Sequence, residues 1–313
     1  MKKLDKKSFH EIRQWIYRNA RPIELAIWQY EFEQGSKDTV LAALSFYQNE
    51  DGGFGNALEP DSWNPNSTPY TTLNAMEKLR DITFTDITHP VMRGIFKFIE
   101  SGIHRNDNGW LFNIPSNNAY PHAPWWTYDK EANEYESIGV TAGIACFLLK
   151  FSDQDSKLYK LALSMVDHLI AKLNKPGNHG EMGVGGYCEL MEVIPQLGLS
   201  DRYDMEFIES TVKRLVNDLI EHDISKWIYY VKTPSSFITT PNSLFYRDNE
   251  EIMLKELDYI IEKRPDNDVW GITWSWFDHN ARYPKEFAIS ENWWKADVAI
   301  RKMKLLRNFD RLE

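Results

Sequence analysis

The sequence predicts an all-α fold built from helical hairpins. Apolar residues recur every three or four positions across 158–173, and again across 208–220, as in helices that bury one face. The segment 138–149 is apolar all round, which is typical of a helix surrounded by other helices. Alternation suited to a strand is limited to 226–232, which could form a short extended piece. Outer amphipathic helices and inner apolar helices therefore alternate along the chain.

Six helical hairpins follow from this alternation, each pairing an outer helix with the inner helix after it. In chain order the expected pairs are 8–19 with 22–34, 37–48 with 68–80, 89–101 with 134–150, 156–173 with 184–197, 204–222 with a short segment near 241–247, and 250–263 with 290–307. The fifth pair is the weakest because its second member is short. We expect all six to belong to one domain spanning 1–313.

Composition and charge exclude several classes of protein. Hydrophobic residues make up 42% of the chain, enough for a sizeable core. The longest apolar stretch, 138–149, is too short for a membrane span, and no apolar signal core follows the first residues, so we expect a cytoplasmic protein. A net charge of −10 without a basic stripe argues against nucleic acid as a partner. The two cysteines, Cys146 and Cys188, are too few for a disulfide framework.

The links between helices differ in length in a regular way. Links from an inner helix to the next outer helix are short, whereas the links inside the hairpins are long: 51–67, 102–133, 174–183, 223–240 and 264–289. Successive antiparallel hairpins place these long links at one end, and they hold eight of the twelve tryptophans. Long ordered loops are often functional, so this end should carry the binding site.

The first long link opens with a specific motif, Gln48-Asn49-Glu50-Asp51-Gly52-Gly53-Phe54-Gly55, directly after an apolar helix. Gly52 and Gly53 permit a tight reversal, Asp51 can bond the turn backbone, and Phe54 can fold back onto the helix end. Asp-Gly is also a hairpin signal, so the preceding run 40–46 could be a strand, although its helical flanks disfavour this alternative.

This motif resembles the repeat of squalene and terpenoid cyclases and of protein prenyltransferase β-subunits. Weaker echoes occur at 106–110, 179–183 and 268–271, each after an outer helix. The resemblance implies an α/α toroid of about six helical hairpins around a central cavity. The catalytic motifs of those families are missing: no D-x-D-D tetrad occurs, and Gly186 stands where the zinc-binding Asp would precede Cys188. We therefore expect no metal and no other cofactor.

Candidate catalytic residues are acids and an imidazole in the long links. They are Glu59, Asp61, His122, Glu134 and Glu136. Carboxylates in pairs can serve as general acid and base, but acids beside helix N-termini are also explained by capping and the helix dipole. Glu189 and Glu192 on the 184–197 helix face either the cavity or solvent.

Candidate substrate-binding residues are mostly aromatic side chains of the same links. They are Trp63, Tyr70, Trp110, Trp125, Trp126, Tyr128, Trp274, Trp276 and His279. Tryptophan faces stack on sugar rings and also stabilise cations in a desolvated cavity. The segment 117–128, which holds two prolines, His122 and two adjacent tryptophans, could equally be a lid that only packs.

Three functions remain open from the sequence. The first is a terpenoid-cyclase-like or prenyltransferase-like protein that holds a hydrophobic or isoprenoid small molecule in its cavity. The second is a carbohydrate-active hydrolase or lyase on a helical toroid, and the third is a non-catalytic binding scaffold. The sequence decides neither whether the protein is an enzyme nor how many copies assemble.

Overall fold

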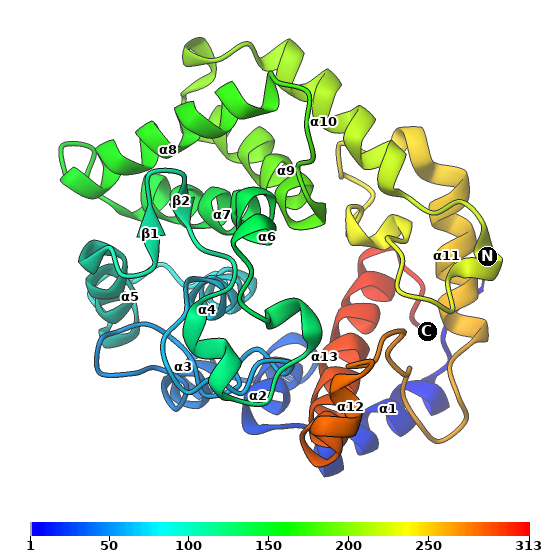
Figure 1. Ribbon diagram of the computed structural model, residues 1–313. Coiled ribbons are helices and arrows are strands. Elements are labelled where there is room, and N and C mark those ends of the chain that lie inside the picture. Colours follow the sequence, from blue (N-terminus) through cyan, green and yellow to red (C-terminus); the bar gives the residue numbers. More distant parts are fainter. Residues whose placement is uncertain (1) are drawn as a thin grey trace. The chain divides into compact units, whose positions relative to one another are not determined.

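A computed structural model describes residues 2–313, and most of them are helical (Figure 1). Among these residues the sheet is a single antiparallel pair, β1 (Arg105–Asn106) with β2 (Gly109–Trp110). The predicted all-α class is confirmed. None of the helices in this range is both long and apolar enough to cross a membrane.

The chain divides into two compact units. The continuous unit comprises Leu44–Leu215, and the split unit comprises the residues up to Ala43 together with Val216–Glu313. Each unit therefore has to be understood through its own contacts.

The continuous unit is organised around one buried helix. Its helices are α4 (Pro69–Asp81), α5 (Pro90–Ser101), α6 (Lys130–Tyr135), α7 (Ser137–Phe151), α8 (Lys157–Leu173) and α9 (Glu181–Gln196), with the 3-10 turns Pro115–Ala119, Pro124–Trp126 and Ser200–Arg202. Helix α7 is buried over 137–149, as its apolar sequence predicts, and it packs against α8 and α9 (Figure 1). A Cβ on Gly186 would lie 2.9 Å from the Gly139 Cα, so these two glycines let α7 and α9 approach closely.

The split unit joins the two ends of the chain. Its helices are α1 (Lys6–Asn19), α2 (Pro22–Phe32), α11 (Glu250–Glu262), α12 (His279–Arg282) and α13 (Pro284–Asn308), with the 3-10 turns Ile224–Lys226, Pro234–Ser236 and Arg247–Asn249. Both α1 and α2 pack against α13. Near the termini, the Leu4 N–H donates to the Arg311 carbonyl at 2.8 Å. Helices α3 (Lys37–Ser45) and α10 (Met205–Leu219) lie where the chain passes from one unit to the other.

Three local expectations were wrong. The segment 241–247 contains turns and the start of a 3-10 turn instead of an inner helix. Helix α13 begins at Pro284 rather than near 290, because proline suits the first helical position. The residues 226–232 form no strand, and only Lys232 joins a bridge, to Ile220.

The motif at 48–55, here called the clasp motif, forms the expected tight reversal after α3. The alternative strand over 40–46 is excluded because this run is mainly helical. Gly52 has a φ of 91°, and the Gly53 N–H donates to Asp51 Oδ1 at 2.9 Å. Phe54 is fully buried. A Cβ on Gly52 would lie 2.1 Å from the carbonyl oxygen of Gly94 in α5, so this loop packs backbone to backbone against a helix.

Candidate functional site

The structure pairs two of the long links of the continuous unit. The Trp63 N–H donates to the Pro121 carbonyl, and the Ala123 N–H donates to the Asp61 carbonyl, both at 2.9 Å. This pairing brings His122 beside the segment that carries Glu59 and Asp61. Three of the predicted catalytic residues thus come from neighbouring backbone segments, although about 60 positions separate them in the sequence.

These three residues are nevertheless interior groups. Glu59, Asp61 and His122 are each 2% exposed. His122 Nδ1–H donates to the Tyr120 carbonyl at 2.6 Å, and Nε2 lies 3.0 Å from the Thr127 hydroxyl. This arrangement orients the imidazole toward its own loop.

The two other predicted acids lie near helix ends. Glu134 is exposed, and its backbone carbonyl accepts a hydrogen bond from Lys172 Nζ. The Glu136 carboxylate accepts from the Met182 N–H at 3.3 Å, in the first turn of α9. The position of the Glu136 carboxylate therefore matches the capping explanation. The helix dipole that stabilises it is that of α9, not that of α7, which Glu136 precedes.

The predicted aromatic residues of this unit range from fully buried to exposed. Tyr70 and Trp126 pack at 4.4 Å between ring centroids, and Phe112 lies 4.7 Å from Trp126. Trp110 and Trp126 are buried, Trp63, Tyr70 and Tyr128 are half-buried, and Trp125 is 36% exposed. Trp125 is therefore the tryptophan of this set with the largest accessible surface.

The remaining predicted residues belong to the split unit. Trp274 lies 5.8 Å from Tyr230 and 5.2 Å from Trp294, measured between ring centroids. Trp276 is fully buried, and His279 stacks edge-on against Tyr283. Trp276 also contacts Phe287 in the first turn of α13, whereas Trp274 contacts the helix further along, at Trp294.

A polar pocket in the continuous unit was not predicted from the sequence. Its volume is about 700 Å³, within the range of small-molecule sites. Its lining combines amides, hydroxyls, two carboxylates and an imidazole with two apolar groups: Asn49, Glu50, Asp51, Asn56, Pro65, Asn66, Ser67, Ile103, His104 and Ser116. The clasp motif, which the sequence predicts to form a tight reversal, also supplies one wall of this pocket.

The pocket walls are fixed by hydrogen bonds. Asn49 Nδ2 donates to the Pro65 carbonyl at 2.9 Å and to Ser67 Oγ at 3.0 Å. Ser67 Oγ donates to Asp51 Oδ1 at 2.6 Å, the same oxygen that receives the Gly53 N–H. Asp51 is therefore anchored through Oδ1, and its Oδ2 can accept from a ligand.

His104 is the titratable group of the pocket that changes charge nearest neutral pH. Burial lowers the pKa of His104, and the Asp51 carboxylate acts in the opposite direction. The net shift is downward, so the imidazole is largely neutral at neutral pH and can both donate and accept. Its backbone has a φ of 59°, which marks a constrained turn.

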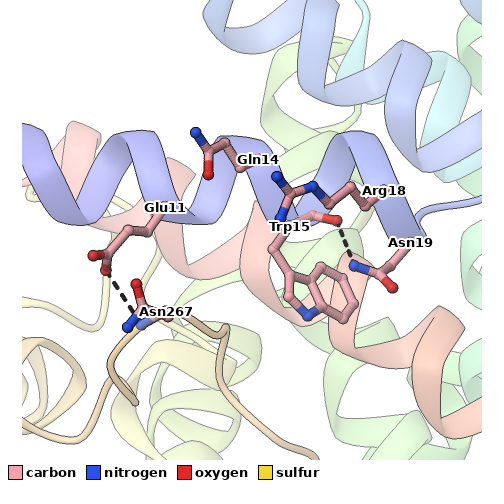
Figure 2. A pocket seen from close by; sticks show the side chains of 6 residues that line it. All are labelled: Glu11, Gln14, Trp15, Arg18, Asn19 and Asn267. Atoms are coloured by element: carbon pink, nitrogen blue, oxygen red, sulfur yellow. Dashed lines mark hydrogen bonds between the residues drawn. The ribbon is translucent and has the colours of Figure 1, made fainter.

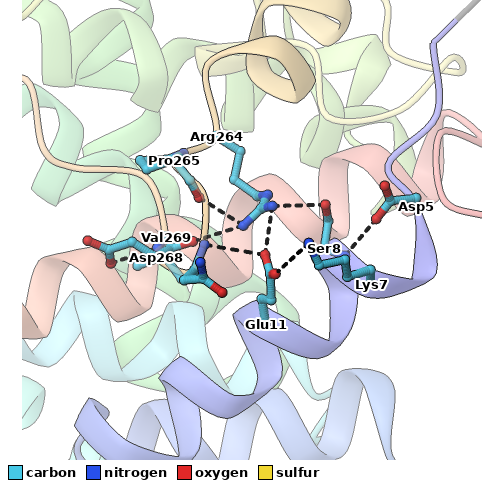
Figure 3. Close-up of polar contacts among 9 residues, drawn as sticks. Asp5, Lys7, Ser8, Glu11, Arg264, Pro265, Asp268 and Val269 are labelled. Atoms are coloured by element: carbon cyan, nitrogen blue, oxygen red, sulfur yellow. Dashed lines mark hydrogen bonds and ion pairs between the residues drawn. The ribbon is translucent and has the colours of Figure 1, made fainter.

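A second pocket, in the split unit, is much smaller. Figure 2 shows Glu11, Gln14, Trp15, Arg18 and Asn19 along α1, with Asn267 facing them from a loop. Its volume of about 120 Å³ is below the usual size of a small-molecule site. The loop is held by Arg264, whose guanidinium donates to Ser8 Oγ and to Glu11 Oε2, both at 2.9 Å (Figure 3).

One further ionisable cluster joins Glu189 to two residues that the sequence did not single out, Glu77 and Arg80. Arg80 on α4 forms an ion pair with Glu189 on α9 at 2.6 Å, and Glu77 lies one turn before Arg80. Burial raises the pKa of Glu77 to about 7; Arg80 opposes this shift and Glu189 adds to it. No group of three or more His, Cys, Asp or Glu side chains within 2–313 is arranged to hold a metal ion.

No family model, curated protein or solved structure matches this chain. Its function has to be inferred from its own geometry.

Proposed function

We propose that the polar pocket of the continuous unit binds a polyhydroxylated small molecule of the carbohydrate class. The observation that carries this proposal is the lining: eight of its ten residues have polar side chains, and the lining comes from four separate segments, 49–56, 65–67, 103–104 and 116. Sugar hydroxyls need alternating donors and acceptors, which amides, hydroxyls and a neutral imidazole supply together.

The pocket also has the order that hydroxyl recognition requires. Asn49, Asp51 and Ser67 are held by hydrogen bonds to one another and to the backbone, so little side-chain entropy is lost on binding. Ile103 and Pro65 offer the apolar contact that the C–H face of a sugar ring prefers.

The isoprenoid hypothesis is less well supported by this pocket. An isoprenoid chain buries many methylene groups and requires a mainly apolar wall, whereas the pocket has two apolar lining residues. It remains a prediction tied to the resemblance, as does the closure of the hairpins into an α/α toroid. We regard carbohydrate binding as the better explanation of the pocket.

A binding experiment with one pocket variant tests the proposal. Saturation-transfer NMR with a panel of neutral and acidic mono- and disaccharides should identify a ligand, and calorimetry should measure its affinity. His104→Asn should weaken binding up to about tenfold, because one ligand hydrogen bond is lost while asparagine tolerates the positive φ.

The matched control is His168→Asn, which changes an exposed histidine of α8 outside the pocket. It should leave the affinity unchanged. If no saccharide binds, or if both variants behave alike, the proposal is wrong. Tight binding of farnesyl diphosphate, unaffected by His104→Asn, would favour the isoprenoid hypothesis instead.

A further inference from the structure

Two lysines of α13 occupy nearly equivalent positions against tryptophan rings. Lys295 Nζ lies 5.2 Å from the ring centroid of Trp15, and Lys302 Nζ lies 5.3 Å from that of Trp270. A spacing of seven residues places both on the same side of the helix. The two lysines can therefore be compared directly, because both lie on α13 and each ammonium lies close to a tryptophan ring.

The two ammonium groups differ in their carboxylate partners. Lys295 Nζ donates to both oxygens of Asp268, at 3.1 and 3.2 Å. Lys302 is half-buried and makes no hydrogen bond or ion pair with another residue of the described range 2–313. A half-buried ammonium without such a partner is destabilised relative to the free amine.

The carboxylate that acts on Lys302 is already engaged. Glu256 of α11 is 3% exposed, and its two oxygens accept from the backbone N–H and the hydroxyl of Ser235, each at 2.6 Å. Its attraction for Lys302 is therefore exerted without direct contact. Arg301, the neighbour of Lys302 on α13, acts against the ammonium form.

We propose that Lys302 is a covalent modification site whose amine accepts acyl groups from small acyl thioesters faster than the ion-paired lysines of α13. The lone pair of the unprotonated Nζ attacks the thioester carbonyl carbon and forms a C–N bond. The C–S bond breaks, the thiolate leaves with the electron pair, and the proton lost from nitrogen passes to the thiolate or to water. The products are an amide on Lys302 and a free thiol.

Protonation equilibria support this assignment. Burial lowers the pKa of Lys302 to about 8, with Arg301 acting in the same direction and Glu256 in the opposite one. A substantial fraction of the amine is then unprotonated at neutral pH, whereas an ordinary lysine with a pKa of about 10.4 is almost fully protonated.

The test uses S-acetyl-N-acetylcysteamine, a small acetyl thioester, with the folded full-length chain. Peptide mass spectrometry follows acetylation at Lys302, Lys295 and Lys304, the last of which is paired with Glu31. Near neutral pH, Lys302 should react about tenfold faster than the other two, since its larger unprotonated fraction outweighs its lower intrinsic nucleophilicity. Its rate should level off above a pH of about 8.

Two variants separate reactivity from simple exposure. Asp268→Asn should increase acetylation of Lys295 toward the rate of Lys302. Glu256→Gln should increase the rate at Lys302 near neutral pH, because the carboxylate that favours the ammonium is removed. Should Glu256→Gln fail to fold, the wild-type comparison is sufficient. Equal rates at Lys302 and Lys295, or a rate at Lys302 that keeps rising with pH well above 8, would overturn the proposal.

Discussion

The two units hold their long loops by different chemistry. In the continuous unit, the loop before α6 is held by hydrogen bonds of a neutral amide. Asn133 Oδ1 accepts from the N–H groups of Phe112 and Asn113, and Asn133 Nδ2 donates to the carbonyls of Asn113 and Asp129. In the split unit, the loop after α11 is held by ion pairs. Arg264 binds Glu11 (Figure 3), and Lys295 binds Asp268.

This difference has a physical consequence for each unit. Hydrogen bonds between neutral amides do not change with proton concentration and respond little to salt. Ion pairs weaken when salt screens them or when acid protonates the carboxylate. The continuous unit should therefore depend on its buried asparagines, and the split unit on solution conditions.

The largest effect is expected at Asn133. Asn133→Ala should lower the free energy of unfolding by about 3 kcal/mol, because the buried Asn113 N–H loses its acceptor and the Phe112 N–H keeps only Ser137 Oγ. An orphaned buried group costs about 1–3 kcal/mol. Urea denaturation measures the loss. The control Asn174→Ala removes one hydrogen bond from an exposed residue to the Ile170 carbonyl and should change stability by less than about 0.5 kcal/mol. If both variants lose the same free energy of unfolding, the buried amide of Asn133 has no special role and the prediction is wrong.

A smaller loss is expected when the cation of the split unit is removed. Arg264→Met should cost more than about 1 kcal/mol, the upper value for an exposed pair, because the Arg264 side chain is 6% exposed. Adding Glu11→Gln should recover part of this loss, since the remaining carboxylate no longer lacks a partner. Lys255→Met, which breaks an exposed pair with Glu251, serves as the control. Additive losses in the double variant would show that the two residues are not coupled.

Acid should destabilise the split unit before the continuous one. Burial would raise the pKa of Asp258 and of Glu11, but hydrogen bonds from Arg311 and Arg264 respectively leave both values lowered. A lowered pKa gives stability that is present above the ordinary values of 3.8 and 4.5 and is lost as pH falls through the folded-state value. Hydrogen exchange by mass spectrometry, corrected for intrinsic rates, should show peptides of the split unit opening first. Simultaneous opening would contradict the comparison.

The smallest effect is expected at Glu77, where the continuous unit has a titrating group of its own. Because its pKa is raised to about 7, its contribution favours folding at low pH and is lost as pH rises from 4.5 toward 7. Glu77→Gln should therefore stabilise the protein by at most about 1 kcal/mol above neutral pH, after allowance for partial exposure. Thermal unfolding at several pH values checks this. A variant that is less stable at high pH would show that Glu77 is needed in its ionised form.

Much of the helical framework could be predicted, because helix position depends on local periodicity. The stripe over 158–173 and the apolar run over 138–149 correspond closely to α8 and α7. The prediction of a helix at 241–247 was wrong because it rested on the need for a partner to 204–222, and the segment has little periodicity of its own. The hairpin of β1 and β2 was missed because two residues per strand give no readable alternation.

The candidate site was less predictable, because it depends on contacts between distant residues. The sequence singled out Asp61 and His122, but their burial follows from the pairing of two loops that local patterns do not encode. The polar pocket combines the clasp motif with His104 and Ser116, which no motif connects. Lys295 and Lys302 look alike in sequence, and they differ in that only Lys295 donates to a carboxylate, that of Asp268.

The split unit is made of two stretches of the chain that lie far apart in sequence, and this has a consequence for folding during synthesis on the ribosome. Helices α1 and α2 emerge first, yet α13, against which they pack, emerges last. The continuous unit, including the closely packed α7, α8 and α9, is complete before that partner exists. Helices α1 and α2 therefore lack this packing partner, and stay accessible to proteases and chaperones, while the continuous unit folds. Ribosome-bound chains stalled before residue 284 should be cleaved within α1 and α2 by limited proteolysis but resist cleavage within α7; resistance of α1 there would refute this order.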